Sequence, residues 1–108
     1  MKLEIFYIDA FTKEQFSGNP AAVIFSNLDD DHLMQKIAAE NNLSETAFIN
    51  LDNNNTIRWF SPTTEVNLCG HATLASAFVY FKFINKDETD IIFQSASGEL
   101  KVNKINDI

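Results

Sequence analysis

Residues 72–84, with the sequence ATLASAFVYFKFI, restrict the folding of this chain more than any other segment. Nearly every position is apolar or small, so a helix over this run has no polar stripe to turn toward water. A helix that is hydrophobic all round is either buried in a protein core or crosses a membrane. A bilayer crossing needs roughly 20 apolar residues, which is more than this run provides. We therefore predict a buried core helix, with a sheet wrapped around it.

Cys69, Gly70 and His71 lie where this helix is expected to begin. The first backbone N–H groups of a helix lack partners within it, and together with the positive end of the helix dipole they bind anions. Gly70 would let the backbone approach a ligand, Thr73 would add a hydroxyl, and an exposed Cys69 would have a lowered thiol pKa. A purely structural interpretation also stands, with Gly70 as a turn residue, Cys69 as a small core hydrophobe and His71 as a cap.

Composition limits the class of protein. The chain has 108 residues, 45% of them hydrophobic and 21% charged, which fits a single globular domain over residues 1–108. Its net charge of −7 argues against nucleic acid or an anionic membrane as a partner. One cysteine allows no internal disulfide and no cysteine-based zinc site. The first residues, MKLE, show no signal-peptide pattern, so we expect a cytoplasmic protein.

The pattern along the chain predicts an α+β fold in one domain. Asp29, Asp30 and Asp31 precede a run with helical spacing, and this helix is expected to end at Asn41 and Asn42. The expected strands cover residues 2–9, 20–25, 45–51, 56–60, 90–94 and 99–103, with turns at 18–20, 52–55 and 97–98. The chain shows no internal repeat and no linker that would separate domains.

Glu45 stands out among the carboxylates because it follows a helix end and enters an apolar strand. Desolvation there would raise its pKa and suit it to proton transfer near neutral pH, although a solvated residue at a strand edge is the simpler alternative. Glu65 would fix the Cys-Gly-His turn by accepting backbone N–H groups, or is an ordinary loop carboxylate. His71 would carry charge or shuttle a proton, whereas we expect His32 to be solvated. The spacing shows no Ser/His/Asp arrangement, phosphate loop or metal-ligand cluster.

Five segments match, in order, the blocks of one known family: FSGNPAAV at 16–23, MQKIAAE at 34–40, LSETAF at 43–48, IRWFSP at 57–62 and EVNLCGHAT at 65–73. On these segments the chain resembles the phenazine-biosynthesis isomerase-like (PhzF-like) family. The resemblance implies the diaminopimelate-epimerase fold, in which two similar halves each curl a mixed, mostly antiparallel sheet around a central helix. The active site of that fold lies between the halves. The matched blocks all belong to the amino-terminal half, and the helix from about Ala72 would be the central one.

The resemblance also implies roles for individual residues. Glu45 falls on the proton-transfer residue of the family, which would act as base and acid to move a hydrogen between carbons of a small, for example cyclic, carboxylic acid without a cofactor. His71 falls on an active-site histidine. The substrate carboxylate would be held at the helix start by Gly70, His71, Ala72 and Thr73. Asn19, in the first block, and Cys69 are further candidates, and no metal is implied.

Cys69 leaves two chemistries open. The better understood phenazine isomerases have a small residue at this position, whereas racemases and epimerases of the same fold use a cysteine there as one of two bases. That second chemistry needs another thiol, and Cys69 is the only cysteine of this chain.

Three modes of action follow from a match to one half of the fold. Two chains would form a homodimer in which each supplies half of the cleft, or the chain would need a complementary second-half polypeptide to become active. In the third mode it binds a small carboxylic acid or a partner without chemistry. Each mode predicts an exposed surface available for association.

Overall fold

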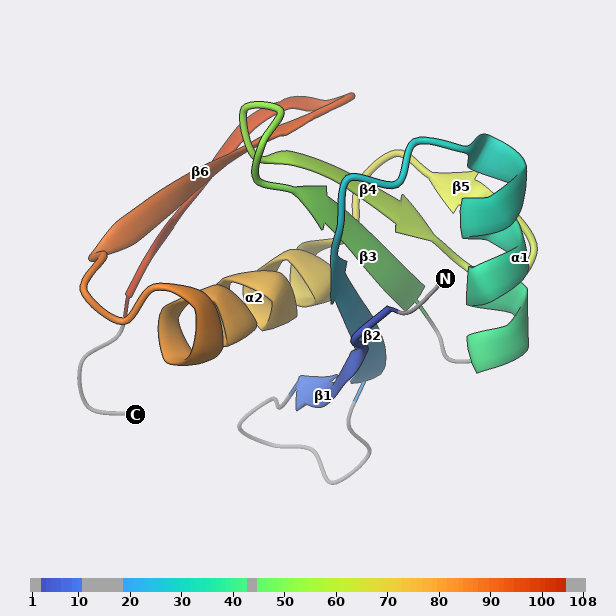
Figure 1. Ribbon diagram of the computed structural model, residues 1–108, viewed down its shortest axis with the longest axis horizontal. Coiled ribbons are helices and arrows are strands. Elements are labelled where there is room, and N and C mark those ends of the chain that lie inside the picture. The colour runs from blue at the N-terminus through green and yellow to red at the C-terminus, as the bar shows by residue number, and fades with distance from the viewer. Residues whose placement is uncertain (1–2, 11–18, 43–44, 105–108) are drawn as a thin grey trace.

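The computed structural model describes residues 3–10, 19–42 and 45–104, and its strands form a single mixed sheet (Figure 1). The seven strands are β1 (Phe6–Ala10), β2 (Asn19–Phe25), β3 (Glu45–Asn50), β4 (Thr56–Phe60), β5 (Glu65–Val66), β6 (Asp90–Ser95) and β7 (Gly98–Asn103). Their order is β1-β2-β3-β4-β6-β7, and β5 pairs with β4. β2 is parallel to β3 and β4 to β6, while the other pairs are antiparallel. The predicted mixed, mostly antiparallel sheet of an α+β fold is confirmed.

Two helices lie on opposite faces of the curved sheet (Figure 1). α2 (Gly70–Val79) lies against the concave face and continues into the π-helical turn η1 (Tyr80–Ile84), while α1 (Asp31–Asn41) packs on the other face. Successive strand side chains point to opposite faces, so Val23 of β2 enters the larger core around α2 and Ile24 the smaller core under α1. The smaller core consists of Ile24, Met34, Ala38, Phe48 and Phe60.

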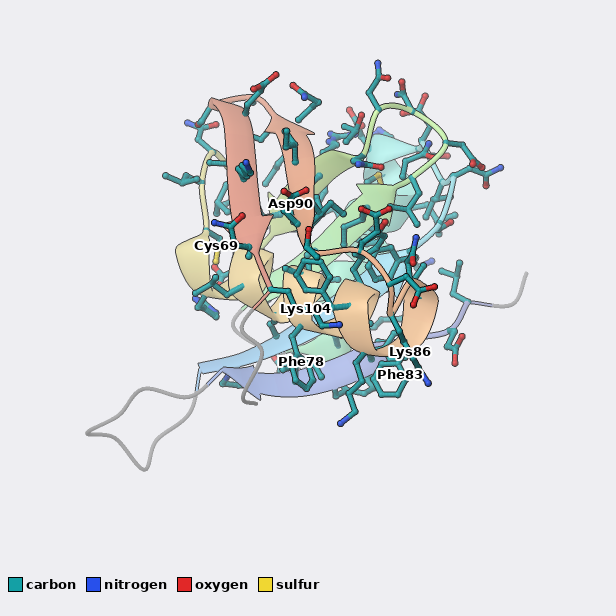
Figure 2. The ribbon with its side chains drawn as sticks, turned by 90° about the vertical axis from the view of Figure 1, so that its left-hand side faces the viewer. Cys69, Phe78, Phe83, Lys86, Asp90 and Lys104 are labelled. Carbon is teal, nitrogen blue, oxygen red and sulfur yellow. The ribbon has the colours of Figure 1, made fainter. Side chains whose placement is uncertain are left out.

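The prediction of a helix buried all round is wrong for one side of α2 and η1. Leu74 is 60% exposed and Phe83 54% exposed, and Phe78 and Ile84 also reach solvent. Figure 2 shows Phe78 and Phe83 on the side of the helix between the β6–β7 hairpin and β1. The physical reason is that the sheet is not closed, because its edge strands β1 and β7 do not pair with each other. The helix is central to the core but is covered on one side only.

The local elements mostly follow the predicted pattern. The side chain of Asp30 caps α1 by accepting hydrogen bonds from the backbone N–H groups of His32 and Leu33, and Asn42 closes it in the left-handed conformation with φ 53°. β1 begins at Phe6 instead of residue 2, and β5 was not predicted because two residues carry no alternating pattern. In the described part of the chain, no helix has the length and apolar character that a membrane crossing requires.

Candidate active site

Glu45 is the first residue of β3 and lies at the edge of a buried strand. The four residues that follow it are buried, so β3 enters the core directly after this carboxylate. Ala21 of the parallel strand β2 is the register partner of Glu45, and β2 begins two residues earlier, at Asn19. The backbone of Asn19 therefore lies at the same end of the sheet as Glu45. The Glu45 side chain is 17% exposed, which leaves it largely screened from water.

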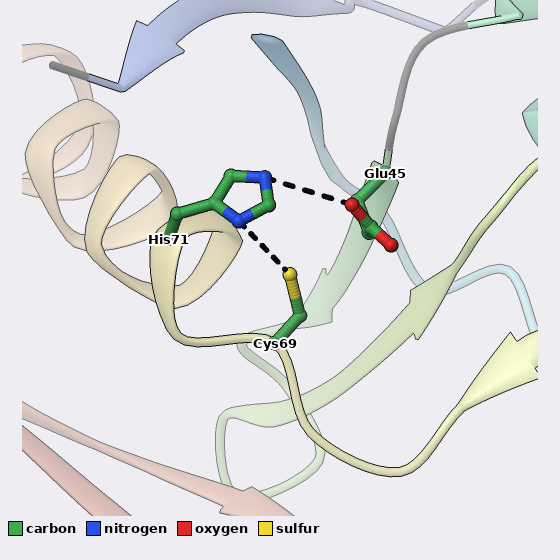
Figure 3. A group of neighbouring side chains, drawn as sticks. All are labelled: Glu45, Cys69 and His71. Atoms are coloured by element: carbon green, nitrogen blue, oxygen red, sulfur yellow. Dashed lines mark hydrogen bonds and ion pairs between the residues drawn. The ribbon is translucent and has the colours of Figure 1, made fainter. Parts of the chain in front are cut away.

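Three side chains from the starts of β3 and α2 come together as the Glu45–Cys69–His71 cluster (Figure 3). Nε2 of His71 lies 3.6 Å from Oε1 of Glu45, and Nδ1 of the same ring lies 3.4 Å from Sγ of Cys69. Cys69 is the N-cap residue of α2, in an extended conformation, and is 8% exposed. Folding thus brings together the two residues predicted for catalysis, Glu45 and His71, and places the thiol beside them.

The start of α2 offers backbone donors at the same place. The Cys69 side chain makes no capping hydrogen bond, and the helix hydrogen bond from the Thr73 N–H to the Cys69 carbonyl measures 3.1 Å. The N–H groups of Gly70, His71 and Ala72 precede this bond and have no acceptor within the helix, so they and the helix dipole attract an anion. A Cβ added at Gly70 would meet nothing within 4 Å, which leaves the approach from this side open.

Thr73 holds the start of the helix in place. Its hydroxyl donates to the Cys69 carbonyl at 2.7 Å and accepts from the indole N–H of Trp59 in β4 at 3.1 Å. The hydroxyl that the sequence suggested for a ligand is therefore engaged in the core, where Thr73 is 5% exposed. Sequence reasoning missed the hydrogen bond from Trp59 because Trp59 lies on another element, β4. The hydrogen bond from Thr73 to the Cys69 carbonyl is local to the start of the helix.

The expectation of a lowered thiol pKa required an exposed Cys69, and the residue is buried. Burial raises the pKa of the Cys69 thiol above its ordinary value, the Glu45 carboxylate adds to the rise, and the backbone N–H groups of Ala72 and His71 oppose it. The raised pKa favours the protonated thiol, and Sγ of Cys69 lies within hydrogen-bond distance of Nδ1 of His71.

Glu65 pairs with Arg58 instead of the Cys-Gly-His turn, so the role predicted for it there is wrong. Nε and Nη2 of Arg58 donate to the two carboxylate oxygens of Glu65, each at 2.8 Å, and Nη1 lies 2.9 Å from Oδ1 of Asp31. Arg58, which sequence reasoning did not single out, links β4, β5 and α1. His32 is exposed, as expected.

Comparison with known proteins identifies the family of this chain. A sequence model of the family described as "Phenazine biosynthesis-like protein" (PhzC-PhzF) matches residues 8–107. The chain belongs to this family. Glu45, Cys69 and His71 all lie within the matched region, and so do the strands and the helix that position them.

Individual relatives in the phenazine biosynthesis-like family match nearly the whole chain. A phenazine biosynthesis-like domain-containing protein of Bos taurus is 51% identical over 99% of this chain and 41% of its own length. A protein of Pseudomonas aeruginosa named an uncharacterized isomerase is 49% identical over 99% of the chain and 42% of its own length. The crystal structure of a PhzF-family protein from Enterococcus faecalis superposes with a TM-score of 0.89 at 46% identity, covering 98% of this chain and 42% of that one. The chain thus spans less than half the length of these relatives and has the fold of their matched part.

Proposed function

We propose that this chain takes part in a cofactor-independent proton transfer on a small carboxylic acid, with Glu45 as general acid and base. The observation that carries the proposal is the position of the Glu45 carboxylate, 3.6 Å from His71 Nε2 and beside the first turn of α2, whose backbone N–H groups have no acceptor within the helix. An isomerisation of this type needs one group that takes a proton and returns it. The isomerase name of a relative that is 49% identical supports the same class of reaction.

The proposed step is balanced without an oxidant or a reductant. The substrate carboxylate binds to the N–H groups of Gly70, His71 and Ala72. A carboxylate oxygen of Glu45 takes the proton of a C–H bond, and the electrons of that bond move into the conjugated acid. Glu45 then returns the proton to a different carbon, which completes the isomerisation.

A second polypeptide region completes the cleft in this proposal. The cluster contacts a substrate from one side, and the relatives are more than twice as long as the matched part. Leu74, Phe78 and Phe83 leave an exposed apolar surface along α2 and η1, of the kind found at interfaces. Either a second copy of the chain or a complementary polypeptide covers it. Light scattering over a range of concentrations separates the two, because only self-association produces a stable dimer of the purified chain.

A binding function without chemistry is the second candidate. The N–H groups at the start of α2, which have no acceptor within the helix, favour it, because an anion site of this kind requires no acid–base residue. In that case the chain would hold a small carboxylate, and the Glu45 carboxylate would contribute nothing to turnover.

Hydrogen exchange in D₂O tests the proposal and separates the two candidates. The full chain is incubated with a panel of small cyclic and unsaturated carboxylic acids, and deuterium uptake into each acid is followed by mass spectrometry. Glu45→Gln should abolish uptake while carboxylate binding, read from the amide chemical shift of Gly70, persists. His32→Gln, at an exposed position away from the cluster, is the matched control and should exchange normally.

Two results would contradict the assignment. Deuterium uptake that persists in Glu45→Gln would show that another group transfers the proton, and a loss of comparable size in Cys69→Ser alone would indicate the thiol. Binding of acids to the wild-type chain with no uptake, in both the monomer and any dimer, would favour the binding function.

A further inference from the structure

The Glu45–Cys69–His71 cluster combines three different metal-binding groups. A carboxylate, a thiol and an imidazole each offer one ligand atom, and these atoms all lie within 4.8 Å of one another. Two of the residues come from the start of α2 and the third from the start of β3, so the arrangement exists only in the folded chain (Figure 3). Sequence spacing gave no sign of it, because Glu45 is far from the other two along the chain.

The separations within the cluster fit a small, thiophilic divalent cation. Zn²⁺ binds sulfur at about 2.3 Å and nitrogen or oxygen at about 2.0–2.2 Å, so two ligand atoms of one tetrahedral ion lie roughly 3.2–3.7 Å apart. The 3.4 Å between Cys69 Sγ and His71 Nδ1 falls in this range, and so does the 3.6 Å between Glu45 Oε1 and His71 Nε2. These two pairs use opposite nitrogens of the ring, so one ion fits either pair, but not both, in the geometry of the unbound chain. The ion binds one nitrogen of the His71 ring together with the ligand atom beside that nitrogen. The third ligand atom, on the other side of the ring, moves about 1 Å toward the ion when it binds.

An independent observation also points to a ligand at this place. Nε2 of His71 is buried and, within the part of the chain that the structure describes, has no hydrogen-bond partner. Its separation from Oε1 of Glu45 lies outside hydrogen-bond range. Buried polar atoms in folded proteins are nearly always satisfied, so an exception calls for a bound water, an ion or a ligand group.

We propose that Glu45, Cys69 and His71 form a binding site for Zn²⁺ or a similar thiophilic divalent cation, with three protein ligands and a fourth position open. Sites with three protein ligands characteristically leave such a position to water or substrate. Binding of the ion displaces the thiol proton of Cys69 and draws the Glu45 carboxylate into coordination. A bound ion would therefore block Glu45 as a base, and Zn²⁺ would act as a chelator-reversible inhibitor of the proton transfer proposed above.

Cobalt provides a direct test because Co²⁺ reports its own ligands. Titration of the full chain with Co²⁺ should produce a near-ultraviolet thiolate-to-cobalt absorption band at one ion per chain, and Zn²⁺ should remove it by competition. Cys69→Ser should abolish the band and weaken Zn²⁺ binding by at least about tenfold, and Glu45→Gln should weaken Zn²⁺ binding while the band remains. His32→Gln, which removes the chain's other histidine beside exposed carboxylates, should change neither.

A measurement on the wild-type chain tests the proposal even if a variant fails to fold. Zn²⁺ should slow alkylation of Cys69 by iodoacetamide at least about tenfold, whereas Mg²⁺, which prefers oxygen ligands, should not. Absence of both the cobalt band and this protection would overturn the proposal, and so would binding that is lost in His32→Gln. These readouts need no turnover, so the metal site and the proton transfer succeed or fail separately.

Discussion

Replacing Thr73 with valine would remove one hydroxyl from the core while keeping the shape of the side chain. That hydroxyl accepts the indole N–H of Trp59 at 3.1 Å and donates to the Cys69 carbonyl at 2.7 Å. Thr73 is 5% exposed and Trp59 1% exposed, so water cannot replace the lost group. The Cys69 carbonyl would still accept the backbone N–H of residue 73, whereas the indole N–H would lose its acceptor.

The size of the stability loss depends on the indole N–H, which is left without an acceptor. A buried donor left without an acceptor costs about 1–3 kcal/mol, while the net contribution of an ordinary hydrogen bond is about 0.5–1.5 kcal/mol. We therefore expect Thr73→Val to lower the free energy of unfolding by about 2 kcal/mol. In a domain of this size each kcal/mol corresponds to about 4–8 °C, so the melting temperature should fall by roughly 8–16 °C.

A double-mutant cycle measured by urea denaturation with circular dichroism checks the reasoning. Trp59→Phe removes the indole N–H, so Thr73→Val in that background leaves no donor unsatisfied. The valine substitution should then cost at least about 1 kcal/mol less than it does in the wild-type chain. Equal costs in the two backgrounds would show that the indole is not held by this hydroxyl and would refute the explanation.

Four further predictions follow from the same structure. Because burial raises the pKa of Cys69, less thiolate exists at a given pH, so iodoacetamide should react more slowly with the folded chain than with the urea-unfolded chain near neutral pH; equal rates would contradict this. Gly98 has φ 110°, so Gly98→Ala should cost about 1–3 kcal/mol in urea denaturation. Gly70→Ala, where an added Cβ meets nothing, should change stability by less than about 0.5 kcal/mol and weaken carboxylate binding measured by titration. Phe93→Ala, at a fully buried position of β6, should cost about 3–5 kcal/mol, whereas Leu74→Gln, at a 60% exposed position of α2, should stay within about 0.5 kcal/mol; similar costs would refute the exposure of Leu74.

Much of the secondary structure could be predicted because its causes are local. The cap at Asp30 and the left-handed Asn42 depend on hydrogen bonds across a few residues, and both are found as expected. The last hairpin turns at residues 96–97, overlapping the predicted turn at 97–98, and Gly98 is the first residue of β7, with a positive φ. The resemblance that identified the family also singled out Glu45 and His71, and the fold brings these two together.

Side-chain environments could not be predicted in the same way. Glu65 lies close to the Cys-Gly-His turn in sequence, yet it pairs with Arg58 because β5 folds back onto β4. For Cys69 the sequence left an activated thiol and a small core residue open, and the structure shows the second, because the residue is buried at the N-cap of α2. In each case the outcome depended on packing between elements, of β5 against β4 for Glu65 and of the core around the start of α2 for Cys69.

The sequence by itself determined the helices and the hairpins, because periodicity, capping and turn chemistry act over a few neighbouring residues. The family followed from the resemblance of whole sequence segments. Only the tertiary structure decided which side of α2 is covered, where the hydroxyl of Thr73 bonds and which three groups meet at the start of the helix. Burial and long-range pairing depend on which surfaces the sheet order brings into contact. An open sheet covers one side of an apolar helix, and the hydrophobic pattern of the helix cannot reveal which side that is.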